Sequence, residues 1–376
     1  MKKLLVIIVS YNVKYYVEQC IVSVQRAASD IDHEIYVIDN HSHDGTVNYL
    51  TRRFGQAITI IDSHHNLGFA RANNIAIRQT QSEYVLLLNP DTFIAEDCLT
   101  EVLAFMDGHP DAGAAGVMMH NGDGSRARES RRGLPTPWVS LLKMTGFSDR
   151  YYLSHLPWDE PGRIQVVSGA FCMLRREVLD QVGLLDESFF MYGEDIDLSY
   201  RILKGGFDVW YVPARIVHYK GESTQKTSYR YVHVFYQAML IFFRKHYSHL
   251  SFLVTLPIQM AIYAKAFVAL VKMQYQNMRF LLGFAQREPS VTRYLFVGSP
   301  AMQEECRQLA QRKGLLAIYS EEPPRQADCD CVVFDTDHFS FRQIIDCASG
   351  FSGDRPLIGT YSSSSKTIIT LHEIIK

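Results

Sequence analysis

Apolar and polar positions alternate in blocks along the first hundred residues, and the blocks predict strands and helices in turn. A continuous run of β-branched and aliphatic residues, typical of a strand buried on both faces, is found at residues 4–9, and further strands are predicted at 34–38, 57–62 and 84–88. Helical spacing follows these runs beyond residue 12, where Val17, Cys20, Ile21 and Val24 share one face, and at 46–54, 71–79 and 95–106. This order predicts an α/β fold with a parallel sheet and helices on both faces.

Polar residues follow three of these predicted strands at their carboxyl ends. They are Ser10-Tyr11-Asn12, Asp39-Asn40 and Asn89-Pro90-Asp91. In open α/β sheets ligands bind at this edge, near the point where the strand order reverses. The chain has neither a Gly-x-Gly-x-x-Gly motif after the first strand nor a Walker-type loop, so we expect a nucleotide held by carboxylates and a divalent cation, with Asp91 as a ligand. Taken alone, Asn-Pro-Asp favours a plain turn with proline at its second position.

A third signal is the acidic stretch Glu194, Asp195 and Asp197, which follows an aromatic run at 189–192. Aromatic residues favour burial, so we expect these carboxylates at the edge of a core. Partial burial and neighbouring like charges raise a carboxylate pKa and make the group a usable base. The alternative is a helix that begins with acidic residues in its first turn.

Residues 112–158 show no regular spacing, which is typical of a mobile or substrate-gripping segment. Arg126, Arg128, Arg131 and Arg132 form a basic patch there. These arginines could contact phosphate or be solvated, and the sequence slightly favours solvation. A further strand is predicted at 166–174.

Length and composition limit the classes of function. A chain of 376 residues with 47% hydrophobic residues predicts two or three folded domains. A net charge of −2 argues against electrostatic binding of nucleic acid. Seven scattered cysteines without metal-site spacing indicate reduced thiols in the cytoplasm. The apolar run at 4–9 ends too soon for the core of a signal peptide.

Two apolar segments follow the expected catalytic region, at 235–243 and 251–271. The second approaches the length of a membrane span, but Pro257 and Lys265 lie inside it. We therefore favour an amphipathic helix or helical hairpin on the membrane surface, with a single span or a pair of core helices as alternatives.

The last part of the chain is expected to be a separate small α/β domain. Strands are predicted at 294–297, 315–319, 331–334 and 356–360, a helix at 301–312, and a serine-rich loop at 361–366. Gly298-Ser299 is only a weak phosphate signal, so the sequence assigns no activity here. The expected domains are 1–245, 246–288 and 289–376.

Together these motifs resemble those of inverting glycosyltransferases of family 2, which have the GT-A fold, a Rossmann-like mixed sheet. In the family's order, the matches are Val9-Ser10-Tyr11-Asn12, Asp39-Asn40, Asn66-Leu67-Gly68-Phe69-Ala70, Asn89-Pro90-Asp91, Gly193-Glu194-Asp195-Ile196-Asp197-Leu198 with Arg201, and His218 with Gly221 and Ser223. They cover about residues 1–245, and their combination is far more specific than any one of them. Asn-Leu-Gly-Phe-Ala with Asn-Pro-Asp is similar to the bacterial rhamnosyltransferase branch.

The resemblance implies roles for individual positions. The nucleotide-sugar-binding residues would be Ser10, Tyr11, Asn12, Asp39, Asn66, Gly68, Arg71, Asn89 and Asp91. Tyr11 and Asp39 would contact the base, and Asp91 would hold the Mg²⁺ or Mn²⁺ that bridges the diphosphate. Asn89 stands where many relatives have a first aspartate. His218 would complete the metal site, and its alternative is a histidine that merely ends a strand.

Inversion requires a general base that takes the proton of the acceptor hydroxyl. Asp195 is the expected base, with Glu194 as the alternative. Asp197 and Arg201 are spaced to form an i,i+4 pair that fixes this acceptor-side loop.

The resemblance implies transfer of a sugar, with rhamnose as a candidate, from a nucleotide-diphosphate sugar to a lipid-linked or polysaccharide acceptor in cell-envelope glycan synthesis. The expected location is the cytoplasmic face of the bacterial inner membrane, as a peripheral protein or with a single span. The alternatives are a sugar-nucleotide pyrophosphorylase, whose Gly- and Lys-rich N-terminal loop is missing here, and a non-catalytic glycan-binding scaffold, against which the joint presence of Asp39, Asp91 and Asp195 argues.

Overall fold

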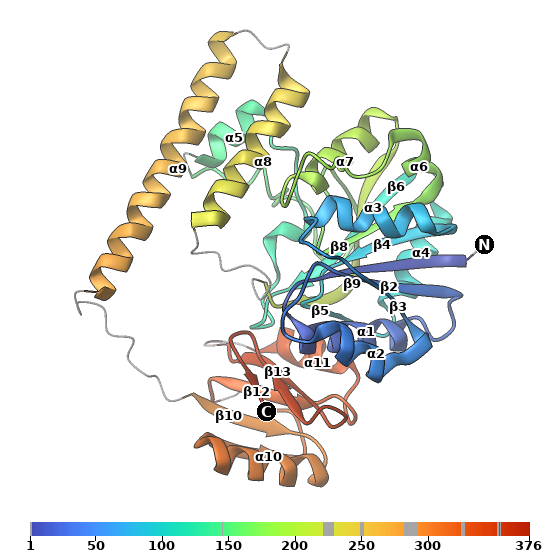
Figure 1. Ribbon diagram of the computed structural model, residues 1–376, viewed down its shortest axis with the longest axis vertical. Coiled ribbons are helices and arrows are strands. Elements are labelled where there is room, and N and C mark those ends of the chain that lie inside the picture. Colours follow the sequence, from blue (N-terminus) through green and yellow to red (C-terminus); the bar gives the residue numbers. More distant parts are fainter. Residues whose placement is uncertain are drawn as a thin grey trace.

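The computed structural model describes residues 2–144, 146–220, 229–248, 252–281, 292–324, 328–351, 353 and 355–376. Two β-sheets with their covering helices account for most of the described residues. A pair of long helices lies between the two sheets in the sequence (Figure 1). This arrangement confirms the expected α/β class, with a mixed first sheet and a second small sheet near the C-terminus.

The first half of the larger sheet is parallel, as the alternating pattern predicts. Its strands lie in the order β3-β2-β1-β4 and are β1 (Lys2–Ser10), β2 (His33–Asp39), β3 (Thr59–Asp62) and β4 (Ser82–Leu88). The chain runs outward from β1 through β2 to β3 and returns to β4 on the other side of β1. The strand order therefore reverses between β1 and β4, which brings Ser10 and the 89–91 turn to the same edge.

The second half of this sheet is mixed, and a simple parallel reading of the sequence misses it. The strands are β5 (Thr92–Ile94), β6 (Ala112–His120), β7 (Gly162–Ile164), β8 (Phe171–Arg175) and β9 (Asp208–His218). β8 runs antiparallel to both β4 and β6, whereas β6 and β9 are parallel. Residues 166–170, predicted as the start of a strand, instead form the turn that leads into β8.

Helices cover both faces of this sheet because β1 is apolar on both faces. Leu4, Val6 and Ile8 face one core, which contains α1 (Lys14–Ala27) and α4 (Cys98–Gly108). Leu5 and Ile7 face the other core, which contains α3 (Phe69–Gln79), α6 (Arg176–Val182) and α7 (Glu194–Lys204). Peripheral elements are α2 (Thr46–Phe54), two 3₁₀ turns (Gly55–Ala57 and Arg128–Ser130) and α5 (Pro137–Met144).

The C-terminal sheet has the order β11-β10-β12-β13-β14-β15. Its strands are β10 (Arg293–Val297), β11 (Leu316–Ser320), β12 (Cys331–Asp335), β13 (Leu357–Ser362), β14 (Thr367–Ile369) and β15 (Ile374–Ile375). The first four are parallel and the last two antiparallel. Its helices are α10 (Pro300–Lys313) and α11 (Phe341–Gly350).

This sheet does not stand apart from the rest of the protein. Phe341 of α11 stacks against Phe93 of β5 with ring centroids 5.1 Å apart, and both belong to the core that contains α1. The Glu96 carboxylate accepts the backbone N–H groups of Phe341 and Arg342, each at 2.8 Å. One hydrophobic core thus joins two parts of the chain that the sequence predicts as separate units.

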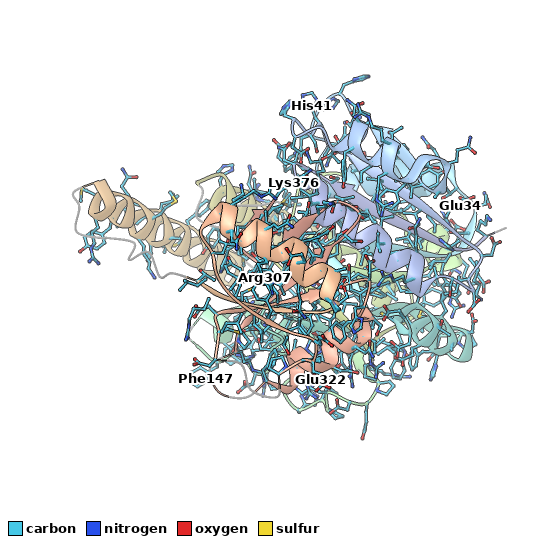
Figure 2. All side chains as sticks on the ribbon, turned by 90° about the horizontal axis from the view of Figure 1, so that it is seen from below. Glu34, His41, Phe147, Arg307, Glu322 and Lys376 are labelled. Carbon is cyan, nitrogen blue, oxygen red and sulfur yellow. The ribbon has the colours of Figure 1, made fainter. Side chains whose placement is uncertain are left out.

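Two long helices, α8 (Tyr229–Tyr247) and α9 (Phe252–Leu281), pack against each other as the expected hairpin. α8 packs on α7 through Ala238 and Phe242, whereas α9 extends away from both sheets (Figure 2). None of the described helices combines the length and the apolar character needed to cross a bilayer.

α9 presents a continuous apolar stripe to solvent. Its exposed large side chains recur at helical spacing and are Leu256, Met260, Tyr263, Phe267, Val268, Val271, Tyr275 and Met278. Trp138 and Phe147, in and after α5, are also exposed. Figure 1 shows α5, α8 and α9 gathered at the end of the molecule opposite the C-terminal sheet.

Candidate functional site

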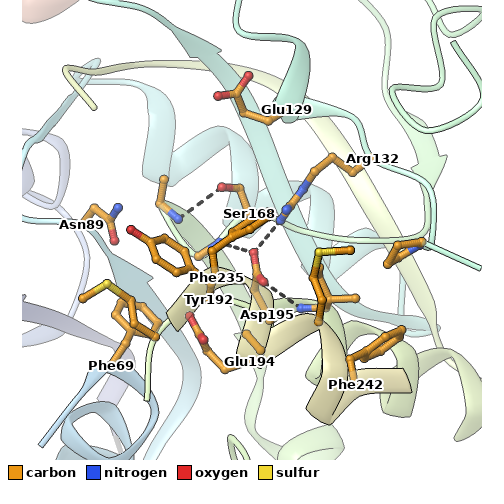
Figure 3. A pocket seen from close by; sticks show the side chains of 18 of the residues that line it. Phe69, Asn89, Glu129, Arg132, Ser168, Tyr192, Glu194, Asp195, Phe235 and Phe242 are labelled. Atoms are coloured by element: carbon orange, nitrogen blue, oxygen red, sulfur yellow. Dashed lines mark hydrogen bonds and ion pairs between the residues drawn. The ribbon is translucent and has the colours of Figure 1, made fainter. Parts of the chain in front are cut away.

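A cavity of about 600 Å³ lies where the sequence places the ligand, at the carboxyl ends of β1 and β4. Its polar wall includes Tyr11, Asn66 and Asn89 from the loops after the strands, and Glu194 and Asp195 from the start of α7. Its opposite wall is apolar and is contributed largely by α8, including Phe235 and Phe242 (Figure 3). The cavity therefore suits a ligand with a polar and an apolar part.

Asp39 ends β2 and precedes Asn40, which lines the cavity. One carboxylate oxygen accepts the backbone N–H of Ser42 at 2.8 Å, and the other has no hydrogen-bond partner among the described residues. Burial raises the pKa of Asp39, and the bond from Ser42 acts in the opposite direction. An unsatisfied buried acceptor at this edge fits the N–H group of a nucleobase.

The loop at 66–68 is shaped by a close approach of two backbones. Gly68 has φ of +78°, and a Cβ atom there would lie 2.2 Å from the carbonyl oxygen of Phe190. The Asn66 side chain accepts the N–H of Gly68 at 3.0 Å, and Asn40 donates to the Gly68 carbonyl at 3.2 Å. Only glycine fits this position, which ties the nucleotide side of the cavity to the loop that precedes α7.

Asp91 and His218 meet across the β5–β9 pair. The nearest carboxylate oxygen of Asp91 is 3.3 Å from Nε2 of His218, and Nδ2 of Asn89 lies 3.2 Å from the same nitrogen. His218 is at the end of β9 and also lines the cavity, so its position at a strand end and a ligand role are compatible. A carboxylate oxygen and an imidazole nitrogen at this spacing fit a divalent cation that takes its remaining ligands from a diphosphate and water.

Asp195 is paired with a buried arginine that the sequence favoured as solvated. The Arg132 guanidinium donates to Asp195 at 2.5 Å, and the side chains are only 12% and 15% exposed. Arg132 also donates to the carbonyl of Val167 at 2.7 Å, and the N–H of Gly169 donates to Asp195 at 3.3 Å. Asp195 is therefore held in one orientation by two neighbouring segments, the one that carries Arg132 and the turn at 167–169.

Glu194 has a different environment. It is buried, and one carboxylate oxygen has no hydrogen-bond partner among the described residues. Burial, and next the charge of Asp195, raise the pKa of Glu194 to about 8. Both carboxylates belong to the first turn of α7, so the acidic helix start and the pocket edge expected as alternatives are the same feature.

Asp197 and Arg201 hold α7 in place and lie outside the cavity. The predicted i,i+4 pair is present, with Nε of Arg201 at 2.9 Å from the Asp197 carboxylate. Asp197 is fully buried and also pairs with Lys245 and His246 of α8, at 2.8 and 2.6 Å. This cluster of charged side chains links the C-terminal end of α8 to α7, the helix that carries Asp195. It therefore also fixes the apolar wall of the cavity relative to Asp195.

Six of the nine expected binding residues are not among those that line the cavity; besides Asp39, Gly68 and Asp91, described above, they are Ser10, Asn12 and Arg71. Ser10 is buried at the end of β1, and the Asn12 side chain accepts the N–H of His43 at 2.7 Å. Arg71 is exposed on α3, 4.0 Å from Glu187. The structure therefore corrects Arg71 to a surface ion pair and gives Ser10 and Asn12 supporting positions. Gly221 and Ser223 lie outside the described residues.

Lys143 on α5 also lines the cavity, although the sequence did not predict it as a site residue. Its ammonium lies 3.4 Å from the ring centre of Tyr151 and makes no hydrogen bond or ion pair with any residue that the structure describes. Burial by the cavity walls, and next the charge of Arg132, lower the pKa of Lys143 to about 8. The only signal in the sequence was the irregular, arginine-rich segment that precedes it.

Comparisons with known proteins find similarity to glycosyltransferases. The profile described as "Glycosyl transferase family 2" matches residues 5–183. The N-acetylglucosaminyl-diphospho-decaprenol L-rhamnosyltransferase of Mycobacterium tuberculosis is 28% identical over 272 residues, which cover 65% of this chain and 84% of that protein. The rhamnosyltransferase WbbL of Escherichia coli is 27% identical over 228 residues, which cover 57% of this chain and 82% of WbbL. A mannosyltransferase from Pyrobaculum calidifontis, solved with GDP-Man and Mn²⁺, has a TM-score of 0.47 at 18% identity and covers 83% of this chain and 81% of its own.

Proposed function

We propose, from the match of residues 5–183 to glycosyltransferase family 2, that this chain transfers a sugar with inversion from a nucleotide-diphosphate sugar to a lipid-linked acceptor in cell-envelope glycan synthesis. The observation that carries this proposal is the two-sided cavity, polar at Asp195 and apolar along α8. Rhamnose is the candidate sugar, because the printed names of two relatives specify rhamnosyl transfer.

The donor binds along the strand ends in this scheme. Tyr11 contacts the base from the cavity wall, and the unsatisfied oxygen of Asp39 accepts a base N–H. Mg²⁺ or Mn²⁺, held by Asp91 and His218, would act as a Lewis acid toward the diphosphate leaving group. The loop around Gly68 places the donor next to the start of α7.

Asp195 acts as the general base. The acceptor O–H bond breaks as Asp195 takes the proton, the oxygen attacks the anomeric carbon, and the nucleoside diphosphate leaves from the opposite face with the bonding electrons. Arg132 fixes the orientation of this carboxylate through a charge-assisted hydrogen bond. Glu194, with a pKa near 8, is largely protonated at pH 7, so it donates a hydrogen bond to substrate instead of accepting a proton.

The acceptor enters between α5 and α8. Lys143, whose ammonium forms no ion pair with the described residues, binds the acceptor's phosphate, and Phe235, Met239 and Phe242 contact the first apolar groups of its lipid. The exposed stripe of α9 and the aromatic residues of α5 lie against the cytoplasmic face of the inner membrane, where such a lipid resides.

Release of nucleoside diphosphate that depends on a diphosphate-linked lipid acceptor tests this function. A thermal-shift screen of dTDP, UDP and GDP with Mn²⁺ first identifies the base, since a bound nucleotide stabilises the folded state. We expect turnover only with donor and lipid acceptor together, and Lys143→Met should raise the KM for acceptor while leaving donor affinity unchanged. Absence of transfer to any lipid-linked acceptor, with the donor bound, would overturn the acceptor class.

Membrane contact is tested by flotation with vesicles that contain anionic lipid. Phe267→Glu, in the centre of the α9 stripe, should shift the protein from the floating to the soluble fraction. Ile318→Glu is the matched control, because Ile318 is also an exposed apolar residue but lies on β11. Equal flotation of both variants would show that α9 does not contact the membrane.

A further inference from the structure

A second cavity lies between the two sheets and shares no lining residue with the first. Its volume is about 450 Å³. Polar and charged side chains dominate the lining, which consists of Met118, His120, Gly124, Arg126, Arg215, Ser349 and Arg355. No role in sugar transfer requires this cavity.

Three arginines from three separate segments converge on it. Arg126 follows the turn after β6, Arg215 lies on β9, and Arg355 precedes β13 of the C-terminal sheet. No acidic residue is among the described residues that line the cavity. The arginines come from both sheets, so a single ligand could bridge them.

Acidic side chains neutralise the positive charges of Arg126 and Arg215 only in part. Arg126 pairs with Asp159 at 3.1 Å in an exposed ion pair, and Arg215 pairs with Asp346. Exposed pairs of this kind contribute little energy and compete poorly with a doubly charged ligand. Arg355 makes no hydrogen bond or ion pair with any residue in the described part of the chain, although its charge contributes to lowering the pKa of Asp123, after the hydrogen bonds from Ser125.

The positive charges of the cavity also act on His120. It is 2% exposed, and its Nδ1 lies 3.0 Å from the carbonyl oxygen of Gly124. Its Nε2 has no hydrogen-bond partner among the described residues. Burial, opposed by the bond to Gly124, and then the charges of Arg215 and Arg126 lower the pKa of His120.

We propose that this cavity binds a small anion with two or more negative charges, of the phosphate or diphosphate class. Arginine is suited to this chemistry because its guanidinium group meets two oxygens of a phosphate at once. The lining has no aromatic ring apart from the imidazole of His120, so it offers no surface for stacking a nucleobase. Free phosphate, pyrophosphate and a phosphorylated metabolite share the chemistry that the cavity recognises.

The test uses the full chain with EDTA present, so that pyrophosphate cannot bind through a metal in the first cavity. Calorimetry with inorganic pyrophosphate and with phosphate, at constant ionic strength, should show one saturable site. Arg355→Gln and Arg126→Gln should each weaken binding at least about tenfold, since each removes a charge-assisted hydrogen-bond donor. Arg52→Gln, on the exposed face of α2, is the matched control and should bind normally.

Melting curves without anion check that both variants are folded, and both arginines are exposed enough to be replaced without loss of core packing. Pyrophosphate should raise the Tm of the wild-type chain and of Arg52→Gln but not of the other two variants. Absence of saturable binding at millimolar concentration, or equal binding by Arg355→Gln and the control, overturns the proposal.

Discussion

Replacing Asp195 by asparagine separates the chemical role of this carboxylate from its structural one. Asparagine keeps the shape and one acceptor oxygen, so Arg132 and the N–H of Gly169 retain a partner. What disappears is the negative charge and the ability to take a proton. We expect turnover to fall by about 10²–10⁴, the usual contribution of a general base. Donor affinity should be unchanged, because Tyr11 and Asp91, which we propose to hold the nucleotide and its metal, follow β1 and β4 and not the start of α7.

The stability cost follows from the burial of the pair. The Arg132–Asp195 bond is charge-assisted and mostly shielded from solvent. Asparagine leaves the buried Arg132 charge without its counter-ion, which costs roughly 3–5 kcal/mol. The Tm should therefore fall by roughly ten degrees, but most of the protein stays folded at 25 °C, so this cost does not explain the loss of turnover.

The assay measures single-turnover rates, nucleotide affinity and Tm on the same preparations of Asp195→Asn and Glu194→Gln. Loss of the Asp195 charge should lower the pKa of Glu194, since that charge is the second cause of its elevation. If Glu194 were the base, Asp195→Asn would stay active and wild-type activity would rise steeply toward pH 8. An active Asp195→Asn beside an inactive Glu194→Gln would refute the assignment.

Three further predictions follow from the site. Asp91→Ala should abolish Mn²⁺-dependent binding of nucleoside diphosphate in calorimetry while leaving the weak metal-free binding intact; unchanged affinity would remove Asp91 from the metal site. Because the pKa of Glu194 is raised in the folded state, its stabilising effect is fully present below about pH 4.5 and is lost as pH rises to about 8. Glu194→Gln should thus gain a few kcal/mol over wild type in unfolding free energy at pH 8.5 and nothing at pH 4, which denaturant titration measures; a constant difference would contradict the shift. Gly68→Ala should lose donor binding and about 1–3 kcal/mol of stability, whereas Gly206→Ala, with φ of +87° and no atom within 4 Å of its Cβ, carries only the backbone strain.

Local patterns predicted the parallel half of the fold because the apolar residues within each strand are enough to indicate that the strand is buried. The runs at 4–9 and 84–88 are apolar on both faces, and the polar turns after them mark the edge where Tyr11 and Asn89 line the cavity. The pairing of β8 with β4 and β6 could not be read in this way, because it joins residues far apart in the sequence, such as Leu88 with Phe171 and Ala114 with Leu174. Nothing local distinguishes an antiparallel partner at that distance.

The role of Arg132 was out of reach for the same physical reason. An arginine in an irregular basic segment is usually solvated, and only the fold brings this one within 2.5 Å of Asp195. The shared core of the two sheets was likewise hidden, since Phe93 and Phe341 are each apolar residues that any domain core would accept. Sequence identified which groups are chemically suitable, and the three-dimensional pairing decided which of them act together.

The shared core has a consequence for how the protein is made. Phe93 and Phe341 are 248 positions apart (341 − 93), so at about 5–20 residues per second a ribosome needs roughly 12–50 s to deliver the second ring after the first. During that interval the newly made catalytic sheet has an uncovered apolar face beside α1, and Phe93 of β5 lacks its contact with Phe341. Expression of this enzyme therefore depends on protecting that face during translation, and chains interrupted before α11 are the ones that quality control should recognise.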